Sequence, residues 1–304
     1  MIRLFKKILD GLLGYIAEKK LSVKGLKYPI IGRTSSPHQI HVCLLHFDAR
    51  IFESSKDLLN FIYRNTRDSL YRIDLLILPP SFGTSLLGVV PFLGKHFYFE
   101  SGAKYVERFQ ELLSERFINL MKWFSKELGI TIISGGVDTK EKTIVQVYDR
   151  GDLLYNRDVS REKPAVIELN DYKLAVLNEK DAKDFRTIRG FMDEGVYVYV
   201  VYSKRSYENL WEDKLDIWAR SQSLGVYGIK SSLSGRIFGK VYRGRSTITA
   251  PIPLTPNLDG YLARSDVVGT AKLTAILDIS KLVSYLKNYE NGYERYWKLL
   301  KQRK

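Results

Sequence analysis

The sequence predicts a mixed α/β protein in which helices cover a system of mixed sheets. From Ile40 onward, segments with the periodicity of amphipathic helices alternate with short runs rich in β-branched and aromatic residues. Some runs pair across turn residues, as around Arg150-Gly151-Asp152, which predicts hairpins between the alternating units. Hydrophobic residues make up 45% of the 304 residues, which is ample material for a core. We therefore expect one large domain with an extension at each end.

The first extension, residues 1–37, is predicted to be an amphipathic helix and a linker. Residues 28–37 are rich in Pro, Gly and Ser and are typical of a linker. A basic amphipathic helix over residues 1–27 can lie on a membrane surface, although docking on the domain or on a twin subunit is more common; both interpretations stay open. One helical face carries Ile2, Phe5, Leu9, Leu12, Leu13 and Ile16.

The central domain, residues 38–283, begins with a β-rich run from Ile40 to Phe47. A helix is then expected to start at Ser54, because Asp57 three residues later forms a variant of the capping box. The next expected elements are a short strand at 73–78 that ends at Pro79-Pro80, a long amphipathic helix at 103–128, and a strand at 130–134 closed by Gly135-Gly136.

The second half of this domain predicts two hairpins followed by two helix–strand units. The hairpins use residues 144–148 with 153–155, and 165–169 with 172–177. A basic, aromatic segment over residues 284–304 ends the chain and favours helical packing over an exposed binding tail. Between the second hairpin and this C-terminal segment we expect a helix at 181–193, a strand at 196–202, a helix at 207–223 and strands at 226–231, 245–250, 261–264 and 271–278.

Composition excludes several classes of protein. No run of about 18 apolar residues is present, so no membrane-spanning helix is expected. Charged residues interrupt the N-terminal apolar stretch, which argues against a secretory signal. Cys43 is the one cysteine, so an internal disulfide is impossible and a cytoplasmic location is expected. Many Lys, Arg, Ile and Tyr residues with a single cysteine suggest a thermophilic source.

The net charge of +14 is informative about binding partners and not about the fold. Nucleic acid and anionic lipid surfaces are the usual counterparts of so basic a chain. The alternative is a solvated basic surface without a specific partner. We favour partner binding.

Five segments, taken in order, resemble the carbon–nitrogen hydrolase family of nitrilases and amidases. The resemblance runs from about Ile40 to Leu282, which is most of the chain. It implies an α-β-β-α sandwich that pairs into homodimers through a helical face. The segments are His41 to Asp48, Asp74 to Pro79, Gly129 to Gly136, Gly244 to Pro251 and Ala271 to Leu282.

The resemblance also implies a reaction, and its residues can be sought in the sequence. In that family a Cys thiolate attacks an amide or nitrile carbon, a Glu takes the proton and a Lys stabilises the oxyanion. The glutamate position, directly after Pro79, is Pro80, and the cysteine position at the end of the strand is Asn178. The stretch from Leu154 to Arg161 offers arginines and no lysine before Lys163. A further acidic position near the end of the helix at 207–223 holds Gln222 and Ser223.

Neither Pro80 nor Asn178 can do the work of the residue it replaces, because proline has no acid–base group and an amide nitrogen is a weak nucleophile. Cys43 lies mid-strand and is expected to be a buried structural cysteine. We therefore predict a pseudoenzyme with no catalytic residues and no cofactor, although a hydrolase with altered chemistry stays an alternative.

Acidic residues gather where the cysteine should be, at Glu179, Asp181 and Asp184. Carboxylates there could do acid–base work or hold a metal. The interpretation we prefer is that Asp181 caps the next helix, with Asp184 in its first turn. The four histidines show no metal-binding spacing, and no phosphate-binding glycine-rich loop is present, so no metal site is expected.

The densest basic segment, from Arg236 to Arg245, interleaves cations with aromatic residues. Cations can neutralise phosphates and aromatic rings can stack on unpaired bases, so this loop is a candidate nucleic-acid site. A solvated loop whose arginine stems pack on tyrosine is an equal alternative. A regulatory or structural subunit, self-paired or paired with a related subunit, also fits the chain. The candidate binding residues are Arg236, Lys240, Tyr242, Arg243 and Arg245.

Overall fold

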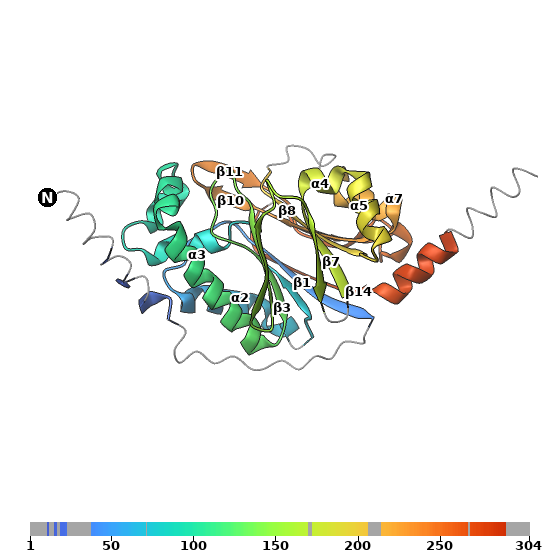
Figure 1. The fold of residues 1–304 in the computed structure, drawn as a ribbon, viewed down its shortest axis with the longest axis horizontal. Coiled ribbons are helices and arrows are strands. Elements are labelled where there is room, and N and C mark those ends of the chain that lie inside the picture. Colours follow the sequence, from blue (N-terminus) through green and yellow to red (C-terminus); the bar gives the residue numbers. More distant parts are fainter. Residues whose placement is uncertain are drawn as a thin grey trace, which may run out of the picture.

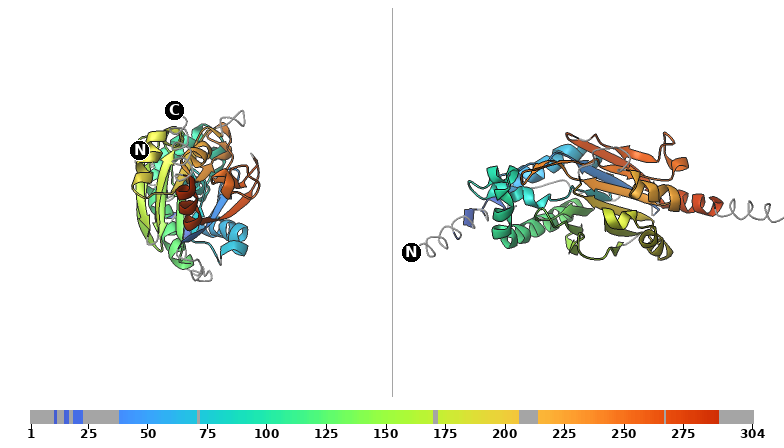
Figure 2. Two further views of the ribbon diagram at one scale, coloured as in Figure 1. Left: turned by 90° about the vertical axis from the view of Figure 1, so that its right-hand side faces the viewer. Right: turned by 90° about the horizontal axis from the view of Figure 1, so that it is seen from above.

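The computed structural model describes the chain at residues 11, 15, 16, 19–22, 38–70, 72–169, 172–205, 214–266 and 268–289. Within these residues it forms a four-layer sandwich: two six-stranded sheets lie face to face, and helices cover each outer face (Figures 1 and 2). The α-β-β-α architecture expected from the sequence is therefore present. In the sequence, the expected helix at 1–27, the linker and most of the C-terminal tail fall largely or wholly outside the described residues.

The first sheet has the order β14-β1-β2-β3-β4-β5. Its strands β1, β2 and β3 are parallel, and antiparallel strands flank them on both sides. The strands are β1 (Gln39–His46), β2 (Leu75–Ile77), β3 (Thr131–Gly135), β4 (Ile144–Asp149), β5 (Asp152–Asp158) and β14 (Ala271–Asp278).

The second sheet has the order β13-β12-β9-β8-β7-β6, with a parallel centre of β7, β8 and β9. A separate two-stranded ribbon, β10 (Ser234–Ile237) with β11 (Lys240–Arg243), follows β9. The sheet consists of β6 (Ala165–Leu169), β7 (Tyr172–Asn178), β8 (Val198–Ser203), β9 (Tyr227–Ser232), β12 (Thr247–Thr249) and β13 (Tyr261–Arg264).

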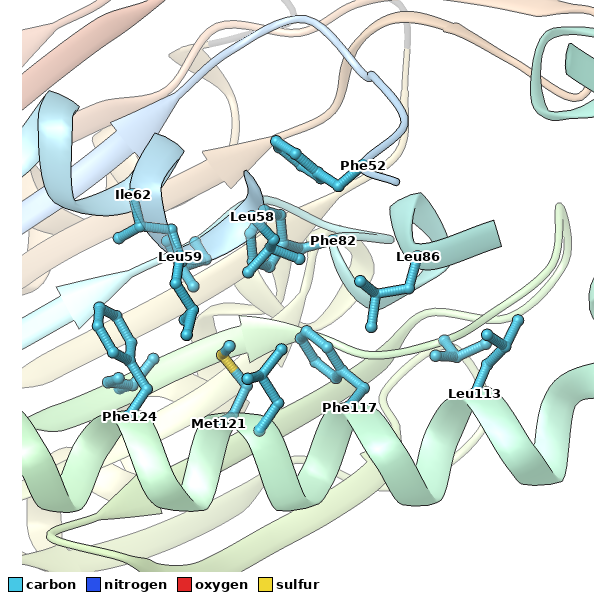
Figure 3. Packing of buried hydrophobic residues seen from close by; sticks show 14 of the residues in the cluster. Phe52, Leu58, Leu59, Ile62, Phe82, Leu86, Leu113, Phe117, Met121 and Phe124 are labelled. Atoms are coloured by element: carbon cyan, nitrogen blue, oxygen red, sulfur yellow. The ribbon is translucent and has the colours of Figure 1, made fainter. Parts of the chain in front are cut away.

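Helices α2 (Ser55–Leu70) and α3 (Ser101–Leu128) cover the first sheet. The expected capping box is confirmed, because the Ser54 hydroxyl accepts a hydrogen bond from Asp57 N at 3.1 Å and donates one to its carboxylate at 2.8 Å. α3 ends at Gly129, whose φ of +67° is the left-handed conformation that glycine adopts readily. Figure 3 shows Leu113, Phe117, Met121 and Phe124 of α3 facing the residues of α2 and the segment after β2.

The segment between β2 and α3 forms two 3-10 helices, η1 (Gly83–Val89) and η2 (Gly94–Tyr98), which the sequence did not suggest. The other outer face carries α4 (Glu179–Lys183), α5 (Phe185–Asp193) and α7 (Ile217–Leu224). The single helix expected at 181–193 is therefore wrong: two short helices replace it. The chain is helical again over 279–289. No helix within the described ranges is long and apolar enough to cross a membrane.

Candidate functional site

The parallel strands of both sheets end at one edge of the sandwich, and the residues that follow them meet there. Hydrogen bonds between the strand ends of the two sheets show that these residues lie together. The Tyr202 hydroxyl at the end of β8 donates to the Leu78 carbonyl just after β2, at 2.8 Å, and the Ser231 hydroxyl of β9 reaches the same oxygen at 3.3 Å. The segments after β2, β3, β7 and β8 therefore line one candidate site.

Pro80 lies in this edge, buried between β2 and Ser81. Ser81 is itself buried and has a φ of +58°, which is unfavourable for a non-glycine residue. Gly135 of β3 lies so close that a Cβ there would stand 2.5 Å from Ser81 N and 2.7 Å from the Pro80 carbonyl carbon. The base position predicted from the sequence thus holds a residue with no proton to exchange, packed tightly against β3.

Asn178 ends β7, and both ends of its amide are engaged. Its Oδ1 accepts from the backbone N–H of Asp181 at 2.9 Å, which makes Asn178 the N-cap of α4. Its Nδ2 donates to the Val159 carbonyl at 2.6 Å. The expected cap by Asp181 is therefore wrong, because Asn178 occupies that role and Asp184 instead caps the following helix α5.

Replacing Asn178 by alanine is expected to lower the free energy of unfolding by about 1–2 kcal/mol, because α4 loses its cap and the Val159 carbonyl loses a donor. Urea unfolding followed by circular dichroism measures this. The exposed Lys180→Ala change in the same helix is the control and is expected to have little effect. Equal stability of both variants would contradict a capping role.

The centre of the edge holds an ion pair, Asp138 with Lys204, that sequence reasoning missed. Lys204 Nζ lies 2.8 Å from Asp138 Oδ2, and its other hydrogen bonds go to the carbonyls of Thr139, at 3.1 Å, and Lys142. Three acceptors use all three ammonium hydrogens. Asp138 in turn accepts from the backbone N–H of Ile144 at 3.1 Å.

Burial sets the electrostatics of this pair. The Asp138 side chain is 0% exposed and that of Lys204 is 10% exposed. Loss of water raises the pKa of Asp138 and lowers the pKa of Lys204, and the partner charge opposes each shift. With every ammonium hydrogen engaged by the protein, Lys204 has none left to stabilise an oxyanion on a substrate. The sequence signal was a charged residue shortly after each strand: Asp138 is three residues beyond the end of β3, and Lys204 directly follows β8.

Glu179 is buried beside Asn178, and its carboxylate is also engaged. It accepts from the Ser203 hydroxyl and lies 2.9 Å from Arg205 Nε. Glu179 and Asp184 thus have separate partners, on β8 and on α5, whereas no hydrogen bond reaches Asp181 Oδ2 within the described residues. Within the part of the chain that the structure describes, no group of three or more His, Cys, Asp or Glu side chains is placed to hold a metal ion.

Cys43 lies within a strand and not at a strand end. It lies mid-strand in β1, is 0% exposed, and packs in the cluster between the first sheet and its helices. Its neighbours Val42 and Leu44 pack in the other cluster, between the two sheets. Burial raises the pKa of Cys43 to about 12, so the reactive thiolate is scarce at neutral pH. The expected structural role of this cysteine fits these surroundings.

The basic segment 236–245, expected as a loop, forms the β10–β11 ribbon. Arg236, Lys240 and Arg243 are exposed on it, and Arg245 beyond it is partly buried. Tyr242 is only 3% exposed and packs in the core, so its ring is not available to stack on a base. This part of the candidate site is therefore wrong. The buried ring supports the ribbon instead, with Lys240 Nζ 5.1 Å from its centroid.

No family model matches the sequence, and no curated protein matches it. Solved structures do match the fold. An amidase variant from Nesterenkonia sp. AN1, with the acetamide moiety of fluoroacetamide attached at its active site cysteine, superposes with a TM-score of 0.60. It is 16% identical, and the match covers 89% of this chain and 100% of that chain.

The chain shares its fold with this amidase. A second structure of the same amidase, described as a nitrilase-superfamily member, matches with a TM-score of 0.59 and 16% identity over 86% of this chain and 98% of that chain. At this identity the comparison concerns the fold alone. The nitrilase-like architecture expected from five sequence segments is confirmed.

Proposed function

We propose that this chain is a nitrilase-fold protein that does not carry out thiol-based acyl transfer and that works by binding. The observation that carries the proposal is Asn178. It stands where the resemblance places the nucleophile, and both ends of its amide are bound to the protein. Pro80 at the base position supports the same conclusion. So does Lys204, because all three of its ammonium hydrogens are engaged by acceptors of the protein.

The partner we propose is nucleic acid, and the β10–β11 ribbon supports this choice. In the ribbon register Arg236 is opposite Val241, and Ser234 is opposite Arg243, so both arginines project from one face. Lys240 adds a third exposed cation at the turn. Because Tyr242 is buried, we expect contacts to phosphates, which give binding that depends on salt more than on sequence.

Turnover assays test the loss of chemistry. Purified protein is expected to leave a panel of aliphatic amides and nitriles unchanged, at a rate no higher than that of the Asn178→Ala variant. Turnover that disappears in Asn178→Ala would show that the candidate site at the strand ends is catalytic and would overturn the first half of the proposal.

Replacing Arg236, Lys240 and Arg243 together by serine is expected to weaken binding to DNA or RNA and to flatten its salt dependence. Loss of three phosphate contacts reduces the slope of log K against log salt by roughly 2–3. Fluorescence anisotropy between about 50 and 200 mM salt measures both effects.

A matched variant serves as the control for net charge. Serine at the exposed Lys180, Arg186 and Lys287 removes the same three charges from other elements and is expected to keep most of the slope. No binding of the unaltered protein to single- or double-stranded DNA or RNA at low salt would sink the nucleic-acid proposal. An equal loss in both triple variants would mean that charge alone, without the ribbon, decides binding.

A further inference from the structure

A cavity of about 500 Å³ lies against α2, one of the helices that cover the first sheet. Its walls come from the segment after β1, from one face of α2 and from Tyr98 of η2. That volume falls within the range of small-ligand sites, about 300–1,000 Å³. The residues that matter for its chemistry are Arg50, Asn60, Phe61, Arg64, Asn65 and Tyr98.

Backbone hydrogen bonds place this cavity directly beside the β10–β11 ribbon. At the base of the ribbon, Ala49 N donates to the Ser234 carbonyl at 2.7 Å. At its turn, Gly239 N donates to the Tyr98 carbonyl at 3.1 Å. The segment after β1 and the 3-10 helix η2, which both contribute residues to the cavity lining, are therefore hydrogen-bonded to the ribbon.

The lining combines groups that suit a nucleotide. Arg50 and Arg64 bring two exposed positive charges, against one negative charge from Asp57. The Arg50 guanidinium is stacked on Phe61, with Cζ 4.8 Å from the ring centroid, which presents a flat, cationic face. Guanidinium groups bind phosphate oxygens well, and flat aromatic or guanidinium faces stack on bases.

Asn60 and Asn65 add amide groups to the same cavity. Amides pair with the hydrogen-bonding edges of bases. Asn65 is held in place by its own bond, from Nδ2 to the Phe61 carbonyl at 2.8 Å. The half-buried Tyr98 also lines the cavity. Its ring meets Phe97 edge to face, with centroids 5.2 Å apart, and its backbone carbonyl is the one bonded to Gly239.

We propose that this cavity takes one unpaired nucleotide of a single-stranded nucleic acid whose phosphates run along the ribbon. The inference rests on the proposed function and adds the form of nucleic acid that is bound. A duplex keeps its bases stacked inside, whereas a single strand can turn one base into a cavity. The cavity thus supplies the base contact that the buried Tyr242 does not.

The test compares a fluorescein-labelled single strand with a duplex of the same length, by anisotropy at about 50 mM salt. Tyr98→Ala is expected to weaken single-strand binding roughly 5- to 150-fold, the effect of losing one base-stacking contact. Duplex binding is expected to stay unchanged. Arg64→Ala, an exposed position that leaves the core intact, is the second variant and is expected to act in the same direction.

Arg67→Ala, at another exposed arginine of α2 outside the cavity, is the matched control and is expected to have no effect beyond one surface charge. Unchanged single-strand binding in both Tyr98→Ala and Arg64→Ala would overturn the inference and leave the ribbon proposal standing. Absence of all nucleic-acid binding by the unaltered protein would instead remove the proposed function itself. Binding of AMP or UMP without any oligonucleotide binding would also overturn the inference, because the ribbon would take no part.

Discussion

Replacing Lys204 by methionine is expected to lower the free energy of unfolding by about 3–5 kcal/mol. The change leaves the Asp138 carboxylate buried with no opposite charge, at 0% exposure. It also removes donors from the carbonyls of Thr139 and Lys142. Methionine has a similar length, so lost packing contributes little, and the cost comes from the uncompensated charge.

Urea unfolding at several pH values tests whether the uncompensated charge of Asp138 causes the loss of stability. Burial already raises the pKa of Asp138, and removal of the ammonium raises it further. A folded-state pKa above the unfolded value means that the folded protein binds a proton more tightly, so acid favours folding of the variant. The difference in unfolding free energy between Lys204→Met and the unaltered protein is therefore expected to become smaller as the pH falls toward the ordinary pKa range of aspartate.

Two comparisons decide the interpretation. The double change Asp138→Asn with Lys204→Met is expected to be more stable than Lys204→Met alone, because no charge is left behind. Lys140→Met breaks the exposed contact with Glu100, at 3.3 Å, and is expected to cost at most about 1 kcal/mol. A loss below about 1 kcal/mol in Lys204→Met would show that the pair contributes no more than a surface contact.

Stability is expected to fall by up to about 3 kcal/mol as the pH drops from about 6.5 to about 4, because of His46 alone. His46 is 1% exposed, and its Nδ1 lies 3.0 Å from the Ser246 hydroxyl across the two sheets. Burial lowers its pKa to about 4, against a smaller opposite effect of Asp48. Between these pH values the unfolded chain holds the proton and the folded chain does not. The stability that His46 provides is complete above about 6.5 and is lost toward pH 4.

Carboxylates also titrate near the lower end of this pH range. The effect of His46 is therefore measured as the difference in pH dependence between a His46 variant and the unaltered protein. His46→Asn keeps a polar group near Ser246 and cannot take up a proton. Its unfolding free energy is expected to depend less on pH between 6.5 and 4 than that of the unaltered protein. His38→Gln, at an exposed histidine, is the control and is expected to keep the original slope. Identical slopes for His46→Asn and the unaltered protein would contradict the assignment.

Local sequence signals predicted much of the fold because they act over a few residues. The Ser54–Asp57 cap and the hairpin turn at Arg150-Gly151-Asp152 both depend on neighbours in the chain. The break between α4 and α5 was missed because Asp184 closes one helix and caps the next, whereas periodicity alone runs on through it. The 3-10 helices η1 and η2 lack the long apolar period that marks an α-helix.

The candidate site could be predicted only where the family resemblance assigns a role to a single position in the sequence, as with Pro80 and Asn178. Asp138 and Lys204 follow strands of different sheets, and only folding brings Lys204 Nζ within 2.8 Å of Asp138 Oδ2. The burial of Tyr242 likewise depends on how the ribbon is bonded at its turn, where Phe238 N donates to the Phe97 carbonyl at 2.8 Å. Contacts between distant segments of this kind leave no periodic mark in the sequence.

The Leu78 carbonyl has a consequence for how the molecule comes apart. One oxygen accepts hydrogen bonds from Tyr202 and Ser231, so a strand end of one sheet is bonded to two neighbouring strands of the other. The two sheets therefore cannot slide or open independently at this edge without exposing buried polar groups. Amide protons in β2 and β8 should exchange with solvent through one shared opening event, with the sandwich behaving as a single cooperative unit.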